Sequence, residues 1–315
     1  MKDLLLTRPW LVYVMLALAT GSWGSAFIAG SFATQDLSPL AVAFFRFFFA
    51  AILLIPIMLT MDKGGRRPRG KEWGLVAVLG LTGIALYNIA FFVATRDAPI
   101  VKSSLFIASN PVLIIVLSGV FLKEVITKRN VVGLLLALTG ATIIITEGHF
   151  QQLIETGFAP IDLVLLFAVV CWALYSVVGK VALKKFSSIT TTTYAVVIGT
   201  LMLMPFVFFE TSVTELKQAS ILTWGSIIHM SVIVSVLSFI MYYQGIKMIG
   251  AAKASIFINF MPLSAVILAT ILLGEQLLFV HIIGAIFVLT GVTYGTWKPR
   301  KIKVKQDVAE VKVKA

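Results

Sequence analysis

The chain has 315 residues, of which 59% are hydrophobic and only 13% are charged. A soluble domain of this size needs far more polar surface, so the composition excludes a soluble globular protein and indicates an integral membrane protein. The net charge of +12 does not indicate nucleic-acid binding, because the Lys and Arg residues lie almost entirely in short loops and in the C-terminal tail.

Ten apolar runs are long enough to cross the bilayer as helices, which takes roughly 20 residues each. The first run is too long for the apolar segment of a signal peptide and shows no small-residue cleavage signature, so we expect it to be retained. The predicted spans are 10–30, 39–61, 72–95, 100–122, 130–146, 161–181, 190–209, 223–246, 253–273 and 280–297.

Basic residues are distributed unequally between the loops on the two sides of these spans. If the N-terminus is cytoplasmic, 22 Lys and Arg residues fall on the cytoplasmic side and three on the other, with Arg46 alone inside a span. This asymmetry predicts a multi-pass protein of the plasma membrane, the inner membrane of a prokaryote, with both termini cytoplasmic. We interpret the tail 300–315 as a solvated basic segment, and a patch that binds anionic lipid or nucleic acid is the alternative.

The sequence contains an internal repeat. A shift of 151 positions aligns spans four and five with spans nine and ten without a gap, and it superposes Ser104 on Ser255, Pro111 on Pro262 and Glu124 on Glu275. A shift of 149 places Trp23 on Trp172. The expected organisation is therefore a first repeat at 1–150, a second at 151–299 and a basic tail at 300–315. Because each unit has an odd number of spans, the two units must be inverted relative to each other.

This pattern resembles the drug/metabolite transporter superfamily, specifically its EamA-like members with ten helices. The resemblance implies a basket-like bundle around a central cavity, lined mainly by the first, third, fourth, sixth, eighth and ninth helices, with the fifth and tenth at the periphery or at a dimer contact. It also implies transport of amino acids, nucleosides or related metabolites, frequently outward. The residues that carry it are Trp23 in Gly-Ser-Trp-Gly-Ser-Ala-Phe, Arg46 in Phe-Phe-Arg-Phe, Asn110-Pro111, Pro262, and the turns around Glu124 and Glu275.

Charged and titratable residues within the spans are few. An unpaired Arg46 would cost at least ~2.5 to 3.5 kcal/mol in the bilayer, so it either contacts an anion in the cavity or extends to the interface and to helix carbonyls. No Asp or Glu lies in the middle of a span, so a carboxylate proton relay is unsupported. His229 is the alternative proton carrier, and a hydrogen-bonded helix contact is its other interpretation.

Aromatic and amide side chains gather at helical spacing on several spans. They suit an amphipathic or ring-bearing organic solute better than a bare ion, and the competing interpretation is an interfacial belt with helix packing. Pro111 and Pro262 are predicted gating or hinge positions, with static kinks as the alternative. The predicted substrate-binding residues are Trp23, Phe27, Arg46, Tyr87, Asn88, Phe91, Asn110, Trp172, Tyr175, Tyr242, Tyr243 and Asn259.

Enzyme chemistry finds no support in the sequence, which has no paired intramembrane carboxylates, metal-spaced His cluster or nucleotide-binding loop. The single cysteine, Cys171, excludes an intramolecular disulfide or a paired-thiol site. Glu124 and Glu275 are interpreted as structural residues that cap the helix that follows or pair with nearby cationic groups. Gly133, Gly140, Gly284 and Gly291 predict close helix packing within one chain or in a homodimer.

The predicted function is therefore secondary or facilitative transport of small organic metabolites, such as amino acids, by alternating access. Export is the favoured direction, and no enzyme activity or cofactor is expected. The alternative is a proton-coupled drug/metabolite antiporter that uses His229, and a scaffold or a channel is more remote. The expected partners are a small-molecule substrate, the lipid bilayer and a second copy in a homodimer, with no nucleic acid.

Overall fold

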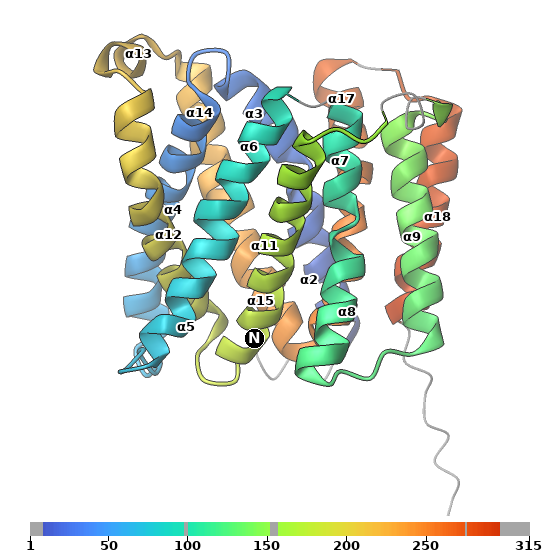
Figure 1. Cartoon of the computed structure of the whole chain (residues 1–315), viewed down its shortest axis with the longest axis horizontal. Helices are drawn as coiled ribbons and strands as arrows, with labels where there is room; N and C mark the ends of the chain where they lie inside the picture. The colour runs from blue at the N-terminus through green and yellow to red at the C-terminus, as the bar shows by residue number, and fades with distance from the viewer. Residues whose placement is uncertain (1–8, 98–99, 152–156, 275, 297–315) are drawn as a thin grey trace, which may run out of the picture.

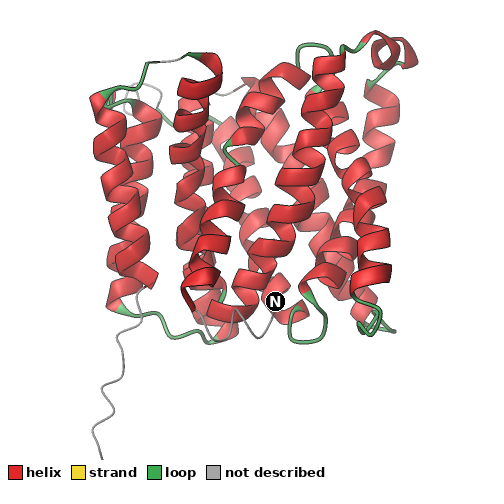
Figure 2. Cartoon of the chain, turned by 180° about the vertical axis from the view of Figure 1, so that it is seen from behind, coloured by secondary structure: helices red, strands yellow, loops and turns green. Residues whose placement is uncertain are grey.

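A computed structural model describes residues 9–97, 100–151, 157–274 and 276–296, and within these ranges every regular element is helical. Ten helical spans are long and apolar enough to cross a membrane, which confirms the predicted number. They stand side by side, with α12 at one lateral edge and α9 and α18 at the other (Figure 1). The view from behind shows the same all-helical arrangement (Figure 2).

The first repeat contains five spans, of which three are interrupted. Their helical bounds, in chain order, are α2 (Pro9–Ser22) and α3 (Ser25–Ala33), α4 (Pro39–Met61), then α5 (Glu72–Leu79), the π-helix η1 (Gly80–Leu86) and α6 (Tyr87–Asp97), then α7 (Ile100–Ala108) and α8 (Asn110–Leu122), and α9 (Lys128–Thr146).

The second repeat has the same number of spans and one short surface helix, α13 (Val213–Gln218). Its spans are α11 (Ile161–Ala182), α12 (Ser188–Glu210), then α14 (Ile221–His229), the π-helix η2 (Met230–Leu237) and α15 (Ser238–Ile249), then α16 (Ala251–Ile256), the 3-10 turn η3 (Phe257–Asn259) and α17 (Phe260–Leu273), and α18 (Phe279–Thr296).

The ends of the predicted spans differ from the observed ones by no more than three residues. The differences arise because polar caps start several helices before the apolar run begins. Ser187 accepts a hydrogen bond from the backbone N–H of Thr190 and starts α12, and Ser220 does the same for α14 through Thr223. Such caps satisfy N–H groups that the first helical turn leaves without partners.

Two matching clasps join the repeats, one at each face of the molecule. Asp36, after α3, accepts hydrogen bonds from the backbone N–H of Ser220 (2.8 Å) and from Thr223 Oγ1 (2.6 Å). At the other face Asp62, after α4, accepts from Ser187 Oγ and from Thr190 Oγ1, the latter at 2.6 Å. Each clasp thus anchors the start of a second-repeat span to a loop of the first repeat. Below, the face at which α2 begins is called the N-terminal face.

Helices α9 and α18 pack against each other through their glycines. A Cβ atom on Gly140 would lie 2.5 Å from the carbonyl oxygen of Gly284, and one on Gly133 would lie 2.3 Å from Cα of Gly295. Only glycine permits this approach of the two backbones. The small-residue stripe that the sequence offered for packing or for a homodimer is therefore occupied within the chain.

We expect Gly140→Leu to lower the free energy of unfolding by roughly 1–3 kcal/mol, because the larger side chain forces α9 and α18 apart. Gly225→Leu is the matched control, since nothing lies within 4 Å of a Cβ atom there. Thermal unfolding in detergent measures both variants. Equal midpoints for the two would contradict the observed packing of α9 on α18.

We expect Asp36→Asn to reduce thermal stability at neutral pH. Hydrogen bonds from Ser220 and Thr223 lower the pKa of Asp36 from its ordinary 3.8 to about 2. A lowered pKa means that the stabilisation is complete above the ordinary value and is lost only as the pH falls through the lowered one. The difference between wild type and variant should therefore be the same at neutral pH and at about pH 5. A difference that shrinks between these two conditions would show that the clasp does not hold an ionised carboxylate.

Candidate functional site

A cavity of about 420 Å³ lies between the two repeats. Its lining comes from the first four spans of the first repeat and from the sixth, eighth and ninth spans of the second. The volume falls in the range of pockets that bind small organic molecules. The described lining combines aromatic rings, small polar groups and one charged side chain.

The cavity opens toward the face opposite the N-terminal face. Its lining reaches Ser31 and Thr34, which are exposed near the end of α3, and Pro39, the first residue of α4. In the other direction the lining stops near the middle of the spans, at Asn110 and Trp172. The space is therefore a one-sided vestibule that ends about halfway across the bundle.

Aromatic rings from both repeats form the inner wall. Trp23 and Trp172, which the repeat superposes in sequence, meet edge to face with ring centroids 5.3 Å apart. Tyr87 lies 5.0 Å from Trp172 and stacks on Phe91 at 6.0 Å with an angle of 6° between the rings. Such rings offer flat apolar surfaces to a solute.

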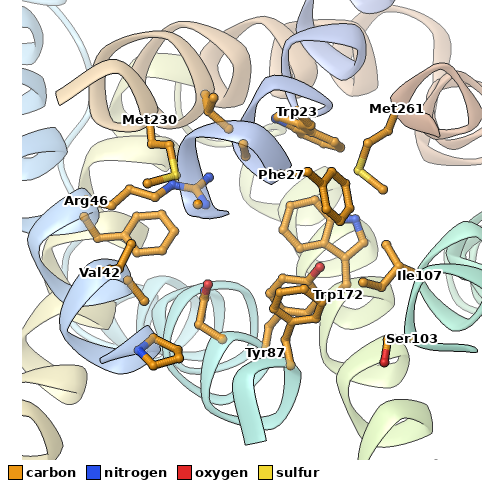
Figure 3. Close-up of a pocket in the computed structure, with 18 of the residues that line it drawn as sticks. Trp23, Phe27, Val42, Arg46, Tyr87, Ser103, Ile107, Trp172, Met230 and Met261 are labelled. Atoms are coloured by element: carbon orange, nitrogen blue, oxygen red, sulfur yellow. The ribbon is translucent and has the colours of Figure 1, made fainter. Parts of the chain in front are cut away.

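Arg46 is the charged residue of the lining. Its Nε donates a hydrogen bond to Ser235 Oγ in η2 at 2.8 Å, and its guanidinium carbon lies 4.9 Å from the centroid of the Phe47 ring. Among the described residues, no carboxylate lies within ion-pair distance of it. Figure 3 shows its side chain beside the open space, between Met230 and Val42. Arg46 therefore presents a positive charge to the cavity.

Two buried polar atoms of the wall lack a hydrogen-bond partner among the described residues, namely Trp23 Nε1 and Asn110 Oδ1. One is a donor and the other an acceptor, and both residues line the cavity. An unpaired buried polar group is costly, and both atoms are shielded from solvent here, so each would bond with a bound solute or water only after a small movement of its side chain.

Eight of the twelve predicted substrate-binding residues line this cavity. The other four, Tyr175, Tyr242, Tyr243 and Asn259, are fully buried outside it. The eight are Trp23, Phe27, Arg46, Tyr87, Asn88, Phe91, Asn110 and Trp172.

The three tyrosines form a layer between the cavity and the N-terminal face, called here the aromatic floor. Tyr175 and Tyr243 have ring centroids 4.9 Å apart, and Tyr243 donates its hydroxyl proton to the carbonyl of Tyr175 at 3.3 Å. Tyr242 lies 5.1 Å from Trp23 and within 3.4 Å of Ser176 Oγ. The floor separates the vestibule from the N-terminal face.

The two predicted hinge prolines flank helix breaks beside the cavity. Pro111 is the second residue of α8, directly after the break at Ser109, and Pro262 is the third residue of α17, after η3. Asn110 Nδ2 donates to the carbonyl of Ile107 at 2.9 Å. That carbonyl would be the helical acceptor for residue 111, which as proline has no N–H to donate.

The predicted alternative proton carrier, His229, lies outside the lining on the exposed surface of α14. Its Nε2 is 2.8 Å from Ser25 Oγ in α3. This geometry matches the helix-contact interpretation rather than a position on a route through the cavity.

Of the second span, sequence reasoning identified only Arg46. Pro39, Val42, Ala43 and Phe47 line the cavity together with Arg46, whereas the family resemblance did not include this helix. Their spacing of three and four along α4 marks one face, and Arg46 was the signal that could have revealed it.

The two π-helices were also not predicted. They occupy equivalent places, in the third span of each repeat, and both contribute to the cavity: η1 through Gly83, and η2 through Met230 and Val234. A π-helix widens the backbone turn and is found frequently at functional sites. No periodicity of apolar residues encodes it.

Comparisons with known proteins agree with this architecture. A solved crystal structure superposes with a TM-score of 0.74 at 19% identity, over 90% of this chain and 97% of that one, and it shares the fold. The "Uncharacterized transporter YyaM" of Bacillus subtilis (strain 168) is 32% identical over 89% of this chain and 92% of its own length. The "Probable terminal-alkyne amino-acid exporter" of Streptantibioticus cattleyicolor is 25% identical over 82% and 84%, respectively.

The protein-family model described as the EamA-like transporter family matches the chain twice, at residues 10–146 and at 159–295. The two matches take in all ten spans and the residues around the cavity. Together with the fold and its vestibule, they show that the chain is a membrane transporter protein that belongs to the EamA-like transporter family.

Proposed function

We propose that this protein is a secondary or facilitative exporter of small organic metabolites, amino acids or similar, that works by alternating access. The observation that carries the proposal is an asymmetry between the fourth and ninth spans. These spans occupy inverted positions in the two repeats, yet they contact each other at one face and are separated by the cavity at the other.

At the N-terminal face, the end of the fourth span is fastened to the start of the ninth. Glu124, just after α8, accepts hydrogen bonds from the backbone N–H groups of Ala251 (3.0 Å) and Ala252 (3.1 Å) in α16. Gly250 permits this approach, because its φ is +91° and a Cβ atom there would lie 2.7 Å from Glu124 Oε2. Helices α8 and α16 also pack directly on each other.

At the opposite face, the corresponding elements are α7 and α17. Within the described residues they have no packing comparable to that of α8 with α16. Instead the cavity lies between them, lined by Ser104 and Ile107 from one side and by Met261 from the other. An exchange of these two arrangements would close the vestibule and open the same space to the N-terminal face.

The distribution of charge supports an orientation for this mechanism. The described loops at the N-terminal face are rich in Lys and Arg, which favours the cytoplasm on that side. With the N-terminal face in the cytoplasm of a bacterial plasma membrane, the conformation described here is outward-open. The printed name of the Streptantibioticus relative, an amino-acid exporter, supports both the solute class and the outward direction. The cavity is lined by one chain, so the proposal requires no second copy.

The direct test is flux of a labelled amino-acid and nucleoside panel in proteoliposomes, with and without an imposed pH gradient and membrane potential. We expect saturable flux without a pH gradient, because no described lining residue is a carboxylate or histidine. Absence of flux across the whole panel would contradict the proposed solute class, and flux that requires both a pH gradient and His229 would favour the antiporter alternative.

Trp172→Ala should reduce this flux roughly tenfold, which corresponds to about 1.4 kcal/mol of lost contact with the solute. Trp10→Ala is the matched control, because Trp10 is 55% exposed at the start of α2 and does not line the cavity. If both variants transport like wild type, the aromatic wall does not bind the solute.

Glu124→Gln should shift the protein toward the cytoplasm-open state by roughly fivefold, since hydrogen bonds to a charged acceptor exceed those to a neutral one by about 1 kcal/mol. A cysteine at Ser255, which is buried in α16, reports this shift when Cys171 is replaced by serine. Labelling by a polar maleimide from the cytoplasmic side should become faster. Glu72→Gln, at the same face but paired with Arg66 and Lys185, is the control and should leave the labelling rate unchanged.

A further inference from the structure

We propose that the preferred solute is a small organic anion of net charge −1, with a carboxylate that binds Arg46 and a flat aromatic body that binds the wall around Trp172. This inference rests on the proposed transport function and specifies its substrate class. Among amino acids and similar metabolites, it favours those with net charge −1 over zwitterions and organic cations, a distinction that the transport proposal alone does not make.

The charge of the cavity is the first argument. Arg46 is the only charged residue among the described lining residues, and none of the others is acidic. A solute with a carboxylate would neutralise this charge, whereas a cationic solute would add a second positive charge in a space of low polarity. The vestibule is therefore electrostatically matched to a monoanion.

The geometry of Arg46 is the second argument. Its hydrogen bond to Ser235 uses Nε, and this bond fixes the plane of the guanidinium group. The two terminal amino groups make no hydrogen bond among the described residues and are left for a ligand. A planar pair of N–H donors is the arrangement that binds a carboxylate in bidentate fashion.

The position of the aromatic wall is the third argument. Figure 3 shows Arg46 with Met230 on one side of the open space, and Trp172, Tyr87 and Phe27 across from them. A solute that spans the cavity would place its charge at one end and an apolar ring at the other. The stacked rings of Tyr87 and Phe91 extend the flat surface.

The unpaired acceptor Asn110 Oδ1 refines the ring end of the solute. The atom is shielded from solvent in this conformation, and after a small rotation of the side chain it would accept a hydrogen bond from a donor such as a ring N–H. A neutral amide oxygen satisfies one N–H but does not neutralise an ammonium group, so a zwitterionic amino acid would leave its positive charge without a described carboxylate partner. An indole carboxylate combines the required anion, flat ring and N–H, and it is the probe for the test.

The experiment measures equilibrium binding to the purified full-length protein in detergent, with four compounds that share one ring and differ in charge. They are indole-3-acetate (anion), indole-3-acetamide (neutral), tryptamine (cation) and tryptophan (zwitterion). We expect indole-3-acetate to bind at least about tenfold more tightly than the other three. Its N-methyl derivative, which lacks the ring donor, should bind about fivefold more weakly than indole-3-acetate.

Arg46→Gln should abolish the preference for the acetate over the acetamide, and Arg46→Lys should retain part of it. Arg129→Gln is the matched control, because Arg129 lies over Tyr294 outside the cavity and should keep the full preference. Elution of each variant as a single folded species, and retained binding of the neutral acetamide, separate loss of charge recognition from loss of folding.

Tighter binding of tryptophan or tryptamine, or a preference that survives Arg46→Gln, would overturn the inference and leave the transport proposal intact. If no compound of the series binds, the proposed class of aromatic carboxylates is wrong. Saturable flux of another metabolite in proteoliposomes would in that case still support the transport proposal. Failure of the inference and failure of the proposed function are thus distinguished.

Discussion

The bilayer requires that each backbone N–H and C=O group find its partner within the protein, and the rest of this structure depends on that constraint. It makes the chain helical throughout the described spans. A break is permitted only where a side chain, or water in a cavity, replaces the lost backbone hydrogen bond. The interruptions follow this rule. Asn110 Nδ2 donates a hydrogen bond to the carbonyl of Ile107. Asn259 Nδ2 donates to the carbonyl of Ile256 at 3.2 Å, and Ser238 Oγ donates to that of Ile233 at 2.6 Å. All five broken spans line the vestibule, together with the unbroken α4 and α11.

In the proposed mechanism, the contacts between the two halves divide into fixed and exchangeable ones. The Asp36 and Asp62 clasps are both formed, one at each face, and the proposed mechanism assigns them to the fixed contacts. The Glu124 contact with α16 and the aromatic floor close only the N-terminal face. A transporter needs both kinds of contact, because the site must keep its shape while its access changes sides.

Much of this architecture can be predicted from the sequence. The spans follow from apolar runs of membrane-crossing length, and the repeat follows from the superposition of Pro111 on Pro262 and of Trp23 on Trp172. Most of the cavity wall follows from aromatic and amide residues that lie too deep for an interfacial belt. The π-helices cannot be predicted in this way, because a widened helical turn has no distinctive residue pattern.

The aromatic floor shows another limit of sequence reasoning. Tyr175 lies one helical turn from Trp172 on the same face of α11, yet only Trp172 reaches the cavity. The position of a ring along the helix decides whether it lines the cavity. The cavity ends where side chains of the other repeat cover the helix, and the sequence of the helix alone does not give that point. The hydrogen-bond partner of Arg46 could not be predicted from the sequence either, since Ser235 lies 189 positions away in η2. Contacts between the repeats therefore required the structure.

The central claim is that the fourth and ninth spans exchange their contacts between the two faces. Pairs of spin labels at Val125 and Lys253 for the N-terminal face, and at Ser104 and Leu272 for the opposite face, would measure it in proteoliposomes once Cys171 is replaced by serine. The account predicts two distance populations for each pair, with the N-terminal pair longer when the opposite pair is shorter, and a ratio that changes when transported solute is added. A single distance at each face, unchanged by solute, would contradict alternating access through this vestibule.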